Sequence, residues 1–303
     1  MNFNLENSIN QQINLIHFAD VELFVKREDR IHPFVSGNKY RKLKYNLKEA
    51  ESLGFRTLLT FGGAYSNHIA AVASAGQLLG FNTIGVIRGD ELKDAKNDSE
   101  TLQFAKSCGM QFKFVSREAY RNKTSRVFID SLKAEFKEFY LVPEGGTNAL
   151  AVSGCEEILT EADDDFDYIC CAVGTGGTIS GLINCSKPSQ QVLGFPALKG
   201  DFLQQDISKF ANKNNWKLIT DYHFGGYAKI NTDLITFINE FKNNFNVPLD
   251  PVYTGKMMFG IMDLIEKDYF PKGSKLLAIH TGGLQGITGM NSVLKRRNLP
   301  IIA

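Results

Sequence analysis

The chain lacks a surplus of charge of either sign. Its 303 residues include 34 Lys and Arg against 33 Asp and Glu, which leaves a formal net charge of +1. Proteins that bind the phosphates of nucleic acids or an anionic membrane surface usually carry a strong positive excess. We therefore expect neither a nucleic-acid partner nor a membrane partner.

Cysteines are few, and no long apolar run is present. The five cysteines show no CxxC or Cys-His spacing of the kind found in metal sites, so we expect no bound metal. No stretch approaches the ~18 apolar residues of a membrane-spanning helix, and residues 1–12 lack the basic and then apolar pattern of a secretion signal. These absences predict a soluble protein of the reducing cytoplasm.

Glycine, by contrast, is well represented. The chain has 27 glycines, and ten of them form Gly-Gly pairs at 62/63, 145/146, 176/177, 225/226 and 282/283. Glycine permits backbone conformations and close approaches that a side chain forbids. The pairs therefore predict several places where the backbone closely approaches another group.

Short apolar runs alternate with longer segments of helical periodicity, which predicts parallel βαβ units and an α/β fold. The length suggests about two domains. We interpret them as a small α/β domain at 45–148, inserted into a larger one formed by 1–44 and 149–303. The predicted strands are 57–61, 82–87, 111–115 and 139–142 in the first set, and 168–173, 191–195 and 275–280 in the second.

A lysine falls on the apolar stripe of a predicted helix that ends at Gly54. Lys39 lies one turn before the stripe of Leu43, Leu47 and Ala50, whereas Arg41, Lys44 and Lys48 are predicted to project to the opposite side. Burial and the neighbouring charges of Arg41 and Lys42 would favour the free amine of Lys39, the form that attacks an aldehyde. The pattern taken alone favours the alternative, a first-turn lysine that reaches out to solvent.

Two glycine-bearing turns lead from a predicted strand into a helix. Backbone amides and hydroxyls of 174–178 (GTGGT) suit a phosphate at a helix N-terminus, although a tight turn without a ligand is the alternative. Ser66, Asn67 and His68 provide donors suited to a carboxylate, although Ser and Asn at such a place are more often helix caps.

Seven segments in order resemble the 1-aminocyclopropane-1-carboxylate deaminase / D-cysteine desulfhydrase family of pyridoxal-phosphate enzymes. The resemblance implies the tryptophan-synthase-β-like fold, in which two open, twisted and mostly parallel sheets are flanked by helices. It also implies a pyridoxal 5'-phosphate cofactor, a small amino-acid substrate and a homodimer. The segments are VKREDRIHPFVSGNKYRKLKY, FGGAYSNH, PEGGTNALAVSG, AVGTGGTISG, GGYAKIN, DPVYTGKMMFG and HTGG.

The resemblance implies a role for each matching residue. Lys39 matches the lysine that holds the cofactor, and this reverses the solvent-exposed interpretation of that residue. Catalytic roles are implied for Lys39, Ser66, Tyr227 and Tyr253. Cofactor contacts are implied for Lys39, Asn67, Gly174, Thr175, Gly176, Gly177, Thr178 and Thr281, and substrate contacts for Ser66, Asn67, His68, Tyr227 and Thr254. The pair Gly145–Gly146 matches a family segment to which we assign no chemical role.

Two positions bear on the substrate. Family members that open the cyclopropane ring typically have Glu where this chain has Thr254, and Leu where it has Thr281. Both residues therefore resemble the D-cysteine desulfhydrase branch. The leading hypothesis is α,β-elimination of D-cysteine to pyruvate, ammonia and sulfide. The first alternative is ring-opening deamination to 2-oxobutyrate and ammonia, and the second is a non-catalytic protein that binds a phosphate-bearing ligand.

Overall fold

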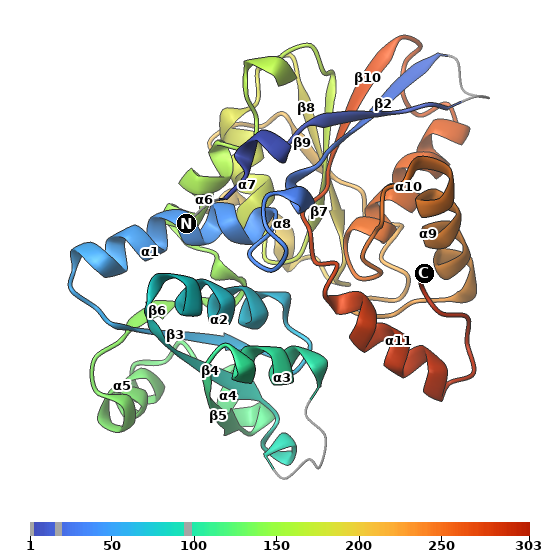
Figure 1. Ribbon diagram of the computed structural model, residues 1–303. Coiled ribbons are helices and arrows are strands. Elements are labelled where there is room, and N and C mark those ends of the chain that lie inside the picture. The colour runs from blue at the N-terminus through green and yellow to red at the C-terminus, as the bar shows by residue number, and fades with distance from the viewer. Residues whose placement is uncertain (1–2, 16–19, 94–98) are drawn as a thin grey trace.

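The computed structural model describes residues 3–15, 20–93 and 99–303, which form two β-sheets with helices on both faces (Figure 1). This arrangement confirms the predicted α/β fold with two mostly parallel sheets. No helix in the described ranges combines the length and apolar character needed to cross a membrane.

The larger sheet has six strands in the order β1-β2-β10-β7-β8-β9, and every pair is parallel except β1 with β2. Its strands are β1 (Asn10–Ile13), β2 (Val21–Lys26), β7 (Tyr168–Val173), β8 (Gln191–Pro196), β9 (Trp216–Leu218) and β10 (Ser274–Ile279). The prediction included β7, β8 and β10. It missed β1, which is almost entirely polar, and β9, which is only three residues long. It also missed β2, which lies between β1 and β10.

The smaller sheet has the order β5-β4-β3-β6, and all of its strand pairs are parallel. Its strands are β3 (Thr57–Gly62), β4 (Asn82–Arg88), β5 (Gln111–Val115) and β6 (Tyr140–Val142), each within a residue of its predicted bounds. All four lie inside the proposed small domain. The proposed lower limit, residue 45, falls within helix α1 (Asn38–Ser52).

Helices cover both faces of each sheet. Around the smaller sheet, α1, α2 and α3 share one core, whereas α4 and α5 form the other. Around the larger sheet, α6, α7 and α8 lie on one face and α9, α10 and α11 on the other. The bounds are α2 (Asn67–Leu79), α3 (Glu100–Ser107), α4 (Arg117–Arg121), α5 (Arg126–Phe136), α6 (Ala149–Glu156), α7 (Gly177–Cys185), α8 (Phe202–Ser208), α9 (Thr232–Phe245), α10 (Thr254–Glu266) and α11 (Gly286–Arg296).

Helix α1 runs along the boundary between the two sheets and is clamped to α6 (Figure 1). Its residues Leu43 and Leu47 belong to the core of the smaller sheet. On its other side the backbone touches α6, because a Cβ at Gly154 would lie 2.0 Å from the carbonyl oxygen of Arg41. A similar contact at Gly181 brings α7 against α6. The start of α1 is thereby held at the junction of the sheets.

Replacing Gly154 by Ala tests this clamp. We expect the added methyl group to push α1 from α6 and to lower the free energy of unfolding by about 1–3 kcal/mol, the usual cost of overpacking. Urea unfolding followed by circular dichroism measures the change. Ser153→Ala, at an exposed position of the same helix, is the control. Equal stability of the two variants would contradict the close contact.

Candidate active site

A cavity of about 530 Å³ opens where the carboxyl ends of both sheets meet, the usual place for a ligand in an open α/β sheet. The loops after β3, β7 and β10 and the first turn of α1 form its walls. Of the predicted site residues, those lining it are Lys39, Ser66, Asn67, His68, Gly174, Thr175, Gly176, Thr178, Tyr227, Tyr253 and Thr281. Gly177 and Thr254 are not among the lining residues.

Lys39 enters the cavity from the first turn of α1. Gly37 precedes the helix with φ of +54°, and a Cβ there would lie 2.3 Å from the carbonyl oxygen of Thr281. The helix can therefore begin directly against the end of β10 only with glycine at this position. The Nζ of Lys39 donates a hydrogen bond to Oδ1 of Asn38 at 2.9 Å, and Asn38 in turn donates to Oγ1 of Thr178.

The amine of Lys39 is poised to lose its proton near neutral pH. Burial lowers its pKa to about 7, and the positive charge of Lys42 adds to the shift. The prediction that the charge of Arg41 helps to lower the pKa of Lys39 is wrong, and so is the predicted direction of the Arg41 side chain. Arg41 does not project into solvent but is buried in an ion pair with Glu28, with Nη2 and Oε1 2.8 Å apart, so its charge is neutralised.

Lys42 is a second lysine of the site, one helical turn after Lys39, and its side chain is buried. Its Nζ contacts the carbonyl oxygen of Gly145 at 3.1 Å and the hydroxyls of Thr147 and Thr175 at 3.0 and 3.3 Å. Within the described residues it forms no ion pair with a carboxylate. Lys42 was not among the predicted site residues. Its i+3 spacing from Lys39, which places both on one helix face, was the available signal.

The glycine loop after β7 forms an anion cradle. Gly176 has φ of +83° and begins α7, whose first backbone amides are free to bind a ligand. Gly177 lies behind the wall, because a Cβ there would approach Oγ1 of Thr147 to 2.7 Å. Gly145, with φ of +66°, packs against Thr175 in the same way. The Gly145–Gly146 turn thus supports this loop from the side of the smaller sheet.

The loop after β3 presents two buried atoms without partners. Ser66 caps α2, its Oγ accepting from the amide of Ile69 at 3.3 Å, so the hydroxyl proton remains free to be donated. Oδ1 of Asn67 and Nδ1 of His68 are buried and have no hydrogen-bond partner in the described part of the chain. Buried polar atoms are rarely left in this state unless a ligand meets them.

His68 differs from its predicted role as a donor. Thr60 donates its single hydroxyl proton to the carbonyl of Val142, so its Oγ1 accepts from Nε2 of His68 at 2.8 Å. Burial and the charges of Lys39 and Lys42 hold the pKa of His68 well below its usual value, and the ring is neutral. Nδ1 is therefore an acceptor, so the donors of this loop that can join Ser66 in binding a carboxylate are its backbone amides and the side-chain amide of Asn67.

Two tyrosines of the cavity wall, Tyr227 and Tyr253, pack edge to face with ring centroids 6.3 Å apart. Tyr253 packs against Gly174, where a Cβ would lie 3.1 Å from its Cε1. Burial raises the pKa of both hydroxyls, although 43% of Tyr227 remains exposed at the cavity mouth. Both side chains therefore stay protonated at neutral pH and can act as donors.

Thr254 lies behind the cavity wall, in contrast to its predicted contact with substrate. It is fully buried as the first residue of α10. Its Oγ1 donates to Oδ2 of Asp250 and accepts from the Asp250 amide, both at 2.9 Å. These two hydrogen bonds hold the hydroxyl of Thr254 at the start of α10.

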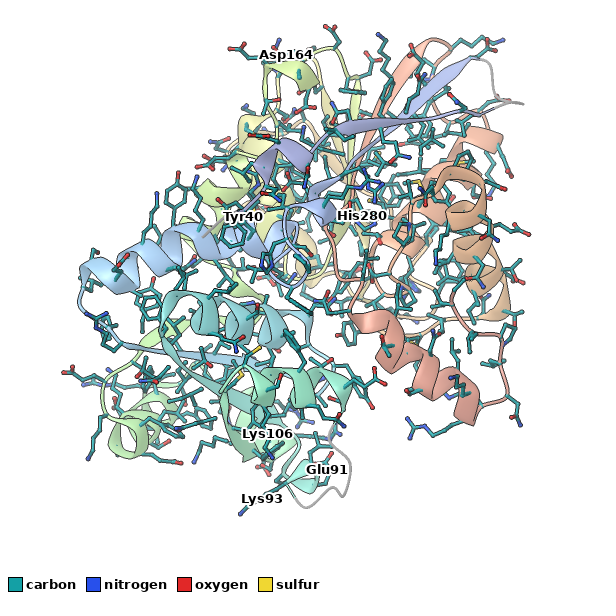
Figure 2. The ribbon with its side chains drawn as sticks, viewed as in Figure 1. Tyr40, Glu91, Lys93, Lys106, Asp164 and His280 are labelled. Carbon is teal, nitrogen blue, oxygen red and sulfur yellow. The ribbon has the colours of Figure 1, made fainter. Side chains whose placement is uncertain are left out.

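His280 and Thr281 follow β10, and Figure 2 places His280 near the middle of the molecule. Nδ1 of His280 accepts from the amide of Gly282, and Nε2 donates to the carbonyl of Pro248 at 2.6 Å. Both ring nitrogens are thus used to hold the loop. Thr281, only 7% exposed, is left to face the cavity.

Comparisons with known proteins agree with this geometry. A family model described as "Pyridoxal-phosphate dependent enzyme" matches residues 10–282. The chain belongs to this family. A "Putative 1-aminocyclopropane-1-carboxylate deaminase" of Pyrococcus horikoshii is 31% identical, over 90% of this chain and 88% of its own length.

Two further similar proteins belong to the deaminase and desulfhydrase group that the sequence resembles. The "Bifunctional D-cysteine desulfhydrase/1-aminocyclopropane-1-carboxylate deaminase, mitochondrial" of Arabidopsis thaliana is 32% identical, over 88% of this chain and 73% of its own. A crystal structure of an "ACC deaminase homologue" superimposes with a TM-score of 0.81 at 28% identity, covering 92% of this chain and 90% of that one. The resemblance found in the sequence is thereby confirmed.

The cavity of this pyridoxal-phosphate dependent enzyme fits its cofactor. The amides of α7, the hydroxyls of Thr175 and Thr178 and the cation of Lys42 together suit a phosphate dianion. Lys39 offers an amine for the aldehyde, and the orphaned Oδ1 of Asn67 needs a donor. These residues supply the complementary chemistry from three separate elements.

A pH titration tests the state of Lys39. Because the pKa is lowered to about 7, the free amine predominates above that pH. We expect the rate at which added pyridoxal phosphate forms its lysine-bound chromophore with cofactor-free protein to rise through a midpoint near pH 7. Lys42→Met should move this midpoint upward, since it removes one cause of the shift. A wild-type midpoint above pH 9 would contradict the assignment.

Lys256 holds the loop that presents Tyr227. Its buried Nζ donates to the carbonyl oxygens of His223 and Gly226, at 2.9 and 2.8 Å. Burial lowers its pKa to about 8. No pattern in the sequence had singled out this lysine, which reaches the loop from α10.

We expect Lys256→Met to lower kcat about tenfold if Tyr227 has its predicted catalytic role, because its hydroxyl loses its fixed position. The effect should largely vanish in a Tyr227→Phe background, which steady-state kinetics of the double variant measure. Lys267→Met, at an exposed lysine that follows the same helix, is the control. Multiplicative effects of Lys256→Met and Tyr227→Phe would show that the two residues act independently.

Proposed function

We propose that this enzyme carries out α,β-elimination on D-cysteine and yields pyruvate, ammonia and sulfide with the uptake of one water. The observation that carries the proposal is the amine of Lys39, which lies in the cavity beside the anion cradle with its pKa lowered to about 7. A protein that only binds a phosphate-bearing ligand has no use for such an amine.

Each predicted residue has a task suited to its environment. When bound, pyridoxal phosphate supplies an electron sink for an attached amino acid. Lys39 as the free amine accepts the α-proton. The hydroxyl of Ser66 and the neighbouring amides bind the α-carboxylate. Tyr253 and Tyr227, whose hydroxyls stay protonated, donate toward the sulfur that leaves.

The neutral residue at the end of β10 supports elimination. Thr281 offers a hydroxyl rather than a charged group to the cofactor ring, which in our proposal leaves the ring nitrogen largely unprotonated and moderates the electron sink. At position 254 this chain has Thr, where ring-opening family members typically have Glu. The carboxylate at the start of α10 is therefore that of Asp250. Thr281 is thus the position in the cavity that supports D-cysteine over the cyclopropane amino acid, whereas Thr254 lies behind the wall.

Ring-opening deamination is the second candidate, because the relatives from Pyrococcus and Arabidopsis carry that activity in their names. A Thr254→Glu variant is a poor way to separate the two, since the new carboxylate would lie against Asp250. Direct product assays on the unmodified protein separate them. A homodimer of this enzyme also remains a proposal.

The decisive experiment offers D-cysteine, L-cysteine, D-serine, β-chloroalanine and 1-aminocyclopropane-1-carboxylate to the cofactor-loaded enzyme. We expect sulfide and pyruvate from D-cysteine at the highest kcat/KM. Lys39→Ala should lose both the visible chromophore and turnover, whereas Lys48→Ala, on the exposed face of α1, should retain them. Preferential formation of 2-oxobutyrate would establish the alternative, and a wild type that forms no chromophore would refute both.

A further inference from the structure

Arg88 is a cation in the cavity that the proposed reaction does not use. It is the last residue of β4, it is exposed, and it lines the cavity wall. Across the described ranges it forms neither an ion pair nor a hydrogen bond. The guanidinium carbon lies 5.7 Å from the ring centroid of Tyr120, a cation–π distance that leaves the N–H groups free.

The carboxylates of the cavity wall are already engaged elsewhere. Glu144 accepts a hydrogen bond from the hydroxyl of Tyr120 at 2.7 Å and pairs with Lys123 at 3.1 Å. Asp206 pairs with Lys209 at 2.6 Å. No carboxylate of the described residues neutralises Arg88, so its charge is left for a ligand.

Arg88 lies beside the loop after β3, which carries Ser66. Parallel pairing aligns Gly62 with Ile87, so the chain leaves β3 for that loop next to the end of β4. A Cβ at Gly63 would lie 3.7 Å from Nη2 of Arg88. On the other side its positive charge acts on the hydroxyl of Tyr227, the residue assigned to the leaving group. The guanidinium thus lies between the loop after β3, to which we assign the α-carboxylate, and the position of the substrate side chain.

We propose that Arg88 binds a second acidic group, carried on the side chain of the substrate, so that the site takes amino acids with an anionic β-substituent. The inference rests on the proposed elimination and deepens it. The cofactor phosphate has Lys42 and the α7 amides, and the α-carboxylate has Ser66 and the start of α2. Among the described residues that line the cavity, Arg88 is the remaining cation, and its planar fork of donors suits a carboxylate or phosphate.

The chemistry of such a substrate balances without a further reactant. Lys39 takes the α-proton, and the bond from Cβ to the substituent breaks with its electron pair on the substituent. For O-phosphoserine the leaving group is inorganic phosphate, and one water converts the remaining fragment to pyruvate and ammonia. A guanidinium at the leaving group stabilises the charge that departs with it.

Kinetics with a charged and a neutral substrate of the same skeleton test the proposal. The quantity measured is kcat/KM for O-phosphoserine divided by that for serine, with both enantiomers of each. We expect Arg88→Gln to lower this ratio at least tenfold, the usual worth of a charge-assisted hydrogen bond. Arg117→Gln, at an exposed arginine paired with Glu91, is the control. An unchanged ratio in Arg88→Gln would overturn the proposal.

A binding measurement separates this proposal from the proposed function. Calorimetry with the cofactor-loaded enzyme compares succinate, a dianion, with butyrate, a monoanion of the same length. We expect the wild type to bind succinate at least tenfold more tightly and Arg88→Gln to lose that preference. This result supports the second anionic subsite even if no amino acid is turned over. Equal affinity of the wild type for both acids overturns it even if D-cysteine releases sulfide.

Discussion

Two lysines one helical turn apart, Lys39 half-buried and Lys42 buried, form no ion pair with a carboxylate among the described residues, and the site depends on this constraint. Lys39 and Lys42 repel each other, and burial prevents water from screening the repulsion. The arrangement is stable only with one amine largely uncharged and neutral oxygens around the other. It thereby creates a nucleophile and an anion site within a few ångströms. The cradle at the start of α7 completes that anion site from the opposite sheet.

Glycines allow the three walls of the cavity to meet at backbone contact. A side chain at Gly37 would collide with the chain just after β10, and one at Gly145 with Thr175 in the glycine loop after β7. A side chain at Gly283 would lie 2.7 Å from the amide nitrogen of Asn67. These contacts link segments from both sheets that are far apart in the sequence. The mild excess of glycine in the composition therefore reflects the assembly of one site, including the pair at 145/146 whose role the sequence had left open.

Most of the buried strands and the glycine turns could be predicted from the sequence, because apolar runs and glycines are local signals. The places of Lys39, Tyr227 and Tyr253 in the cavity followed from the family resemblance. Contacts between distant segments carry no such signal. Arg41 lies on a polar helix face and yet is buried, because it forms an ion pair with the buried Glu28. Thr254 was assigned to the substrate by its place in a motif, but Asp250 holds its hydroxyl. The donor character of His68 depended on Thr60, a residue within a strand that no motif singled out.

The position of α1 has a consequence for the cooperativity of unfolding. Its apolar stripe is part of the core of the smaller sheet, and its backbone is clamped by Gly154 to a helix of the larger one. A fragment that began at residue 45 would start in the middle of this helix and lose Leu43 from its core. We therefore expect the two sheets to unfold together, and a ligand bound at the start of α1 to stabilise both of them.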